Sequence, residues 1–174
     1  NVVLRRSAGL TVENGVIASY IHNAAAPGLG KIGVLVALSS AGDQATLAAF
    51  GKQVAMHIAA ARPEAVTRES VDASLLDRER AVLADQARES GKPEEIVEKM
   101  IEGRLQKYYQ DIVLNEQTFV IDNETKVADA TAAAAKEAGA AIEITGFLRF
   151  ELGEGVEKKE SNFAAEVAAA QSGS

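Results

Sequence analysis

The chain has 174 residues, of which 47% are hydrophobic, and a formal net charge of −7. The acidic balance argues against DNA or RNA as a direct partner, because phosphate binding needs a basic surface, and the lack of cysteine excludes disulfides, a thiolate metal site and a Cys nucleophile. No apolar run approaches the length of a membrane span and no secretory signal opens the chain, so we expect a cytoplasmic protein without membrane contact.

Apolar and polar residues alternate over residues 2–12, and this pattern predicts a first strand. Asn14-Gly15 supplies the positive backbone angles of a tight turn, so residues 16–22 are expected to form the next strand. After a glycine-containing loop, the nearly continuous apolar run 31–38 predicts a buried strand.

Asp43 is expected to cap a helix over residues 44–61, which Pro63 ends. His57 falls on the apolar side of this helix. We therefore interpret it as a hydrogen-bonded core histidine in preference to a catalytic one.

Residues Ser74 to Ile112 are the most informative stretch, because two charged amphipathic segments are separated by only four residues, 90–93. Gly91 can end the first helix in the left-handed conformation, and Pro93 suits the first position of the second helix. So short a connection forces the helices to run antiparallel. This predicts a projecting hairpin that contacts other proteins.

Thr125 is expected to cap an Ala-rich helix that ends at Gly139, and residues 142–152 alternate as a last strand. The alternation predicts that Ile144 and Leu148 lie on the same face of that strand.

Three expected strands precede the hairpin and one follows it, so sheet and helices segregate along the chain. This order favours an α+β fold: an antiparallel sheet of about four strands packed by helices, with an inserted antiparallel helical hairpin that forms a coiled coil. We expect residues 1–70 and 113–155 to form the core subdomain, 71–112 the hairpin, and 156–174 a C-terminal helical module.

Residues 28–33 match the pattern G-x-G-x-x-G, but a strand rather than a helix is expected to follow. We therefore interpret them as a flexible loop and not as a dinucleotide site. His22 sits at an expected strand end, and an enzyme built around it and a carboxylate is an alternative, although its neighbours supply no orienting acid. With only two histidines and no cysteine, we expect neither a metal nor a cofactor.

Short segments spread over nearly the whole chain carry a specific resemblance. They are Ser-Tyr-Ile-His at 19–22, Gly-Lys-Ile-Gly-Val-Leu-Val-Ala at 30–37, Ala-Met-His-Ile-Ala-Ala at 55–60, Ser-Gly-Lys-Pro at 90–93, Glu-Lys-Met-Ile-Glu-Gly-Arg at 98–104, Thr-Gly-Phe-Leu-Arg-Phe at 145–150 and Phe-Ala-Ala-Glu-Val at 163–167. In this order they resemble the bacterial elongation factor Ts family, the guanine nucleotide exchange factors of elongation factor Tu.

The resemblance implies a protein that is not an enzyme and that promotes GDP release by binding elongation factor Tu. It also implies a contact surface on the core and a second one on the tail, which packs on the GTP-binding domain of the partner. The implied contact residues are His22, Asn23, Val120, Ile121, Phe163 and Glu166.

Members of this family begin with a small helical domain and a core half that bears a Thr-Asp-Phe-Val motif, and this sequence contains neither. The chain also starts with Asn1 instead of an initiator Met. We therefore expect a processed chain or an excised C-terminal portion, which binds elongation factor Tu but is impaired in GDP release. Self-association through the helical hairpin is an alternative role.

Overall fold

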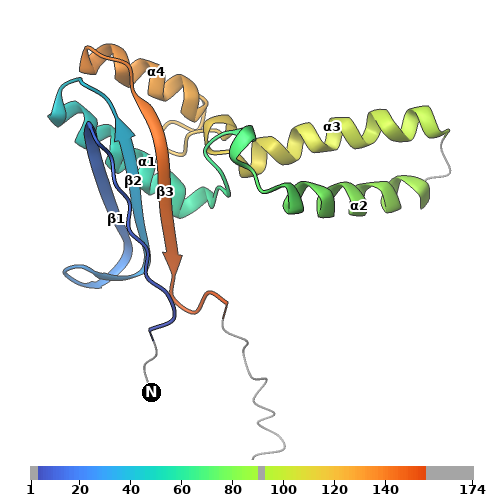
Figure 1. The fold of residues 1–174 in the computed structure, drawn as a ribbon, viewed down its shortest axis with the longest axis horizontal. Coiled ribbons are helices and arrows are strands. Elements are labelled where there is room, and N and C mark those ends of the chain that lie inside the picture. Colours follow the sequence, from blue (N-terminus) through green and yellow to red (C-terminus); the bar gives the residue numbers. More distant parts are fainter. Residues whose placement is uncertain (1–3, 90–92, 156–174) are drawn as a thin grey trace, which may run out of the picture.

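The computed structural model describes residues 4–89 and 93–155, which form a three-stranded antiparallel sheet and four α-helices, an α+β architecture (Figure 1). The strands are β1 (Gly15–Ala26), β2 (Leu29–Ser39) and β3 (Glu143–Glu151), and the sheet order is β1-β2-β3. The helices are α1 (Gln44–Ala61), α2 (Ala73–Glu89), α3 (Glu94–Ile112) and α4 (Val127–Ala138), and the short 3₁₀ turns are η1 (Arg68–Ser70) and η2 (Leu114–Glu116).

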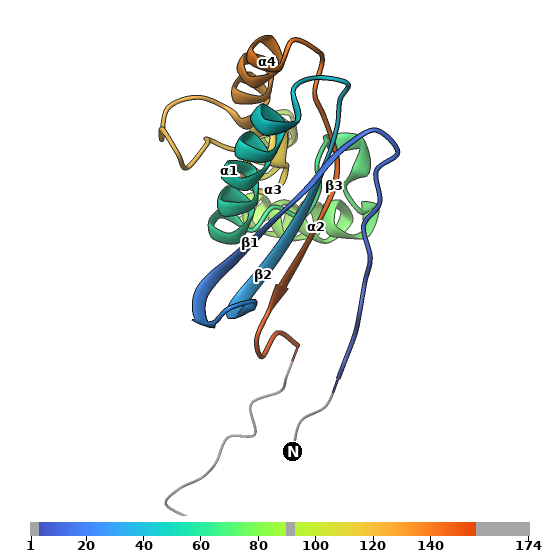
Figure 2. The same ribbon diagram turned by 90° about the vertical axis from the view of Figure 1, so that its left-hand side faces the viewer.

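The predicted first strand is wrong, because residues 4–12 form no strand, and the described residues contain three strands instead of about four. The Arg6 guanidinium lies 4.4 Å from the centre of the Phe150 ring, and the Leu10 side chain approaches Gly146. Figure 2 shows the segment running beside β3. Only Leu10 and Val12 of the described alternating residues are half-buried, whereas Leu4 and Ala8 are exposed, and the segment lacks the backbone pairing that defines a strand.

The glycines at the β1–β2 turn serve strand pairing. Gly28 adopts a φ of +75° in the turn, and Gly30 pairs with Ala24 inside the sheet. A Cβ atom at Gly30 would lie 2.7 Å from the carbonyl oxygen of His22, so a larger residue would push the strands apart. The interpretation of this segment as a flexible loop is therefore wrong.

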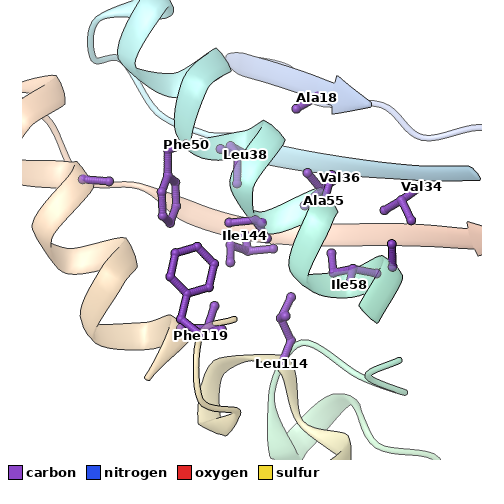
Figure 3. Packing of buried hydrophobic residues seen from close by; sticks show 14 residues of the cluster. Ala18, Val34, Val36, Leu38, Phe50, Ala55, Ile58, Leu114, Phe119 and Ile144 are labelled. Atoms are coloured by element: carbon purple, nitrogen blue, oxygen red, sulfur yellow. The ribbon is translucent and has the colours of Figure 1, made fainter. Parts of the chain in front are cut away.

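Helix α1 begins and ends as predicted and covers one face of the sheet (Figures 1 and 2). The Asp43 side chain accepts a hydrogen bond of 2.8 Å from the backbone N–H of Thr46, which confirms the predicted cap. The buried side of α1 takes part in the main core cluster (Figure 3). The cluster includes Ala18, Val34, Val36, Leu38, Phe50, Val54, Ala55, Ile58, Ala59, Leu114, Phe119, Val127, Ala134 and Ile144.

A bulge at Thr145 shifts the faces of β3. Ile144 lies in the core, but the next residue that packs against the core is Phe147 and not Leu148. The predicted placement of Ile144 and Leu148 on one face is therefore wrong, because one extra residue in a strand reverses the side-chain alternation beyond it.

Helix α4 begins two residues later than Thr125, with Lys126 in the N-cap position and no side-chain cap. The predicted cap at Thr125 is wrong, because its hydroxyl donates to Asp122 instead. At the other end, Gly139 has a φ of +76° and ends the helix as predicted.

Helices α2 and α3 lie side by side, run in opposite directions and project away from the sheet (Figure 1); we call the pair the arm. Leu83 and Ala87 of α2 and Leu105 of α3 are buried, whereas most of the arm surface is charged and exposed. The sequence predicted Pro93 as the first residue of the second helix. This is wrong, because α3 begins at Glu94 and Pro93 precedes it as the N-cap residue. The predicted cap at Gly91 lies outside the described residues.

A buried histidine joins α1 to the segment that returns from the arm. His57 has no exposed surface, and its Nε2 lies 2.8 Å from Oε1 of Gln117. Its Nδ1 accepts a hydrogen bond of 3.2 Å from the backbone N–H of Val120. This pairing requires a neutral ring with the proton on Nε2, and it confirms the interpretation of His57 as a core histidine.

Two helical glycines provide a matched test of packing. A Cβ at Gly51 in α1 would lie 2.7 Å from Cβ of Ala18 in β1, whereas one at Gly103 in α3 would meet nothing within 4 Å. We expect Gly51→Ala to lower the free energy of unfolding by about 1–2 kcal/mol through overpacking, and Gly103→Ala to raise it by up to about 1 kcal/mol through helix propensity. Urea unfolding followed by circular dichroism measures both, and a Gly51→Ala protein of unchanged stability would contradict the close approach of α1 to β1.

Stability should also depend on the protonation of His57. Burial lowers its pKa from the ordinary value of 6.5, and the hydrogen bond that its Nε2–H donates to Gln117 only partly opposes this. Below about pH 7 the unfolded chain takes up a proton on this histidine that the folded chain does not. The free energy of unfolding should therefore fall as the pH drops, by at most about 1.4 kcal/mol per pH unit, until the pKa of His57 in the folded chain is reached.

Urea unfolding between pH 7.5 and 5.5, above the range in which carboxylates titrate, measures this dependence. His57→Gln should remove the slope. His22→Gln, which changes the only other histidine, should keep it. Equal slopes in the two variants would show that His57 is not the group responsible.

Candidate protein-binding site

Val120 and Ile121 lie in a loop, residues 118–126, that we call the contact loop. Thr118 and Lys126 pair at its base as an isolated antiparallel bridge. The loop is therefore closed over a short length of chain, which limits the conformations of the two side chains at its tip.

Hydrogen bonds inside the contact loop fix its shape. The N–H of Phe119 donates to the carbonyl of Thr125 at 2.7 Å, and the N–H of Asn123 donates to the carbonyl of Phe119 at 2.8 Å. Asn123 has a φ of +56°, a left-handed conformation that Asn tolerates. The Thr125 hydroxyl and the Glu124 N–H donate to Asp122 and lower the pKa of that carboxyl, which therefore stays ionised.

The contact loop is anchored inward by Phe119 and presents Ile121 outward. The ring of Phe119 faces that of Phe50, with 6.3 Å between the ring centres (Figure 3), and Val120 is tied to His57 through its backbone N–H. Ile121 remains 43% exposed, which is unusual for a large apolar residue in an ordered loop. Its position suits a contact with another molecule.

His22 and Asn23 lie at the far end of β1, beside the turn to β2. His22 is exposed, and its Nδ1 lies 3.0 Å from the hydroxyl of Tyr20. This hydrogen-bond partner is a phenol and not a carboxylate, so the geometry does not give His22 the orienting acid of a general base. Asn23 adopts a φ of +51°, and a register shift between Ala24 and Ala26 distorts the hairpin end.

The structure does not gather the predicted contact residues into one cluster. The contact loop and the β1–β2 turn form two protrusions, which lie on the left side of the molecule in Figure 2, with α1 nearby. The exposed side of α1 carries alanines together with Lys52, Gln53 and Met56, and Met56 is 36% exposed. Phe163 and Glu166 lie outside the described residues, as does the whole predicted C-terminal module.

The base of the arm is held by residues that the sequence did not single out. Arg68 of η1 forms a two-point ion pair with Glu116 of η2, with 2.7 Å between Nη2 and Oε2, and its guanidinium lies 4.5 Å from the centre of the Tyr109 ring. The hydrogen bond from Arg68 lowers the pKa of Glu116. Because 48 residues separate the two partners in sequence, no local pattern could have predicted the pair.

Within residues 4–89 and 93–155, no three His, Asp or Glu side chains come close enough to hold a metal ion. Nor does any helix in that part of the chain have the length and apolar character needed to cross a membrane. What the fold displays is a rigid loop tip, a hairpin end and a charged arm.

Comparisons with known proteins agree with the sequence resemblance. The family model described as Elongation factor TS matches residues 1–154. Elongation factor Ts of Rhodospirillum rubrum is 62% identical over 169 residues, which are 97% of this chain and 55% of that protein. Elongation factor Ts of Bartonella henselae is 57% identical over 173 residues, which are 99% of this chain and 56% of that protein.

The chain therefore spans about half the length of the curated relatives that it matches. The family match nevertheless covers the β1–β2 hairpin, the arm and the contact loop together. The chain belongs to the elongation factor Ts family.

Proposed function

We propose that this chain binds elongation factor Tu in translation and promotes GDP release from it. The observation that carries the proposal is the family match over residues 1–154, because it includes the core residues that the resemblance assigns to the partner: His22, Asn23, Val120 and Ile121. The action is a binding equilibrium with no covalent step. We accordingly propose a cytoplasmic protein that is not an enzyme, needs no cofactor and touches neither nucleic acid nor membrane.

The mechanism follows from reciprocity. A protein that binds nucleotide-free elongation factor Tu more tightly than the GDP form must weaken GDP binding by the same factor. Coupling of about 1–3 kcal/mol corresponds to roughly 5–150-fold. Rigid surfaces serve this purpose, because less binding energy is lost in ordering them.

We assign the contact surfaces from the family resemblance. We place His22 and Asn23 at one contact and Val120 and Ile121 at another, where the internal hydrogen bonds of the contact loop support a pre-organised surface. Phe163 and Glu166 are proposed contacts of the tail.

The domain limits carry over as proposals: residues 1–70 and 113–155 as core, 71–112 as an inserted coiled coil and 156–174 as the C-terminal module. The antiparallel, mostly charged arm supports the coiled-coil assignment. Self-association through the arm stays a prediction. Val82 and Ile96 are the large apolar side chains of the described arm that are most exposed, at 50% and 46%.

We expect the 174-residue chain to bind nucleotide-free elongation factor Tu more tightly than the GDP form. We also expect elongation factor Tu to release GDP more slowly with this chain than with a full-length relative. The reason is that the sequence contains no Thr-Asp-Phe-Val motif, which in the family is expected to disturb the nucleotide site. Release of fluorescent GDP, measured with this chain and with a full-length elongation factor Ts side by side, tests the expectation. Equal rates would refute the role given to that motif.

Replacing single exposed residues tests the two surfaces. We expect His22→Ala and Ile121→Ser each to weaken binding of nucleotide-free elongation factor Tu by about tenfold, as for contacts worth more than about 1 kcal/mol. Ile17→Ser is the matched control: Ile17 is 41% exposed and, next to the buried Ala18, points to the sheet face away from α1. Titration calorimetry measures the affinities, and an unchanged affinity in both test variants would remove these residues from the interface.

A further inference from the structure

A groove of about 480 Å³ runs between α1 and α4 and is bordered by the contact loop. Phe50 of α1 and Phe119 of the loop line it, and their rings pack against each other with 6.3 Å between the ring centres (Figure 3). The α4 side consists of Ala130, Ala133 and Ala134, whose side chains are too short to fill the space between the two helices. The floor of the groove is therefore apolar and of fixed shape.

The charged residues of the rim all have the same sign. Asp129 and Glu137 of α4 line the groove, separated by eight residues and thus by about 12 Å along the helix axis. Asp122 of the contact loop adds a third carboxylate, while the α1 side contributes only uncharged residues such as Thr46 and Gln53. No Lys or Arg lines the groove, and none in the described part of the chain forms an ion pair with these carboxylates.

All charged side chains that line the groove are negative. Carboxylates around an apolar floor give the groove a negative potential, which a basic partner would complement. A nucleic acid has the wrong sign for this surface. The groove fits an apolar side chain flanked by Lys or Arg on a protein surface.

We propose that the groove between α1 and α4 docks a segment of the partner protein in which an apolar side chain lies between basic residues. The inference rests on the proposed function and deepens it, since it defines the chemistry of the segment that elongation factor Tu would present. Ile121 lines both the groove and the proposed contact surface, so the two form one continuous interface. The apolar floor provides affinity, and the acidic rim provides orientation and rate of association.

The test changes the rim without disturbing the fold. Asp129→Asn combined with Glu137→Lys alters the charge by three units; both residues are exposed, and a Lys in the last turn of α4 suits the helix dipole. Glu13→Lys with Glu64→Gln makes the same change in charge at exposed residues outside the groove. Binding of each full chain to nucleotide-free elongation factor Tu is measured by calorimetry over a range of salt concentrations.

We expect the rim variant to bind about tenfold more weakly at low salt and to show a shallower salt dependence, because rim charges act through screened attraction. The control pair should stay close to the unmodified chain. Ala133→Gln, which fills the floor with a helix-favouring side chain, should weaken binding at every salt concentration. Circular dichroism melting of all variants checks that they fold.

Other results overturn the inference in distinguishable ways. If the unmodified chain does not bind elongation factor Tu, the proposed function fails and the groove assignment with it. If the chain binds but neither the rim variant nor Ala133→Gln changes the affinity, the groove alone is wrong. If sedimentation shows a dimer that the rim variant dissociates while partner binding persists, a second copy occupies the groove instead.

Discussion

The buried hydrogen-bonded pair of His57 and Gln117 holds together parts of the fold that the arm separates in the sequence. His57 belongs to α1, and Gln117 follows the arm; besides their mutual bond, the Gln117 amide donates to the carbonyl of Asp111 near the end of α3 at 2.6 Å. The carbonyl of Gln117 accepts from the N–H of Val127 at the start of α4. Gln117 thus links three helices, α1 and α3 through its side chain and α4 through its backbone carbonyl. Because both groups are buried, breaking the pair would leave polar atoms unsatisfied, which typically costs about 1–3 kcal/mol.

The same pair decides where the outer surfaces lie. His57 also accepts from the N–H of Val120 and so positions the contact loop, while Arg68 and Glu116 fix the base of the arm a few residues away. A distortion at this junction would therefore move the loop tip and the arm relative to the sheet. The chain thus carries its exposed features on supports that the core makes rigid.

Surface charge and core packing have separate roles in this design. The arm and the helix faces carry mixed charges that remain in solvent, and ion pairs such as Arg88 with Asp85 are exposed and contribute little to stability. The groove between α1 and α4 is different, because its acidic rim surrounds an apolar floor. The small residues of α4 leave this space unfilled between the two helices.

Local patterns in the sequence predicted the four described helices, the places of the three described strands in the chain and the class of the fold. Three confirmed features depend only on residues close together in the sequence, and spacing therefore reveals them. They are the cap of α1 by Asp43, the end of α4 at Gly139 and the place of His57 on the buried side of α1. The family resemblance supplied the candidate contact residues, which no local pattern pointed to. The tertiary structure alone decided the bulge at Thr145, the non-strand path of residues 4–12, the closure of the contact loop, the pairing of Arg68 with Glu116 and the groove. Each of these depends on which segments meet across long stretches of chain, and side-chain periodicity records only that a face is buried, not what buries it.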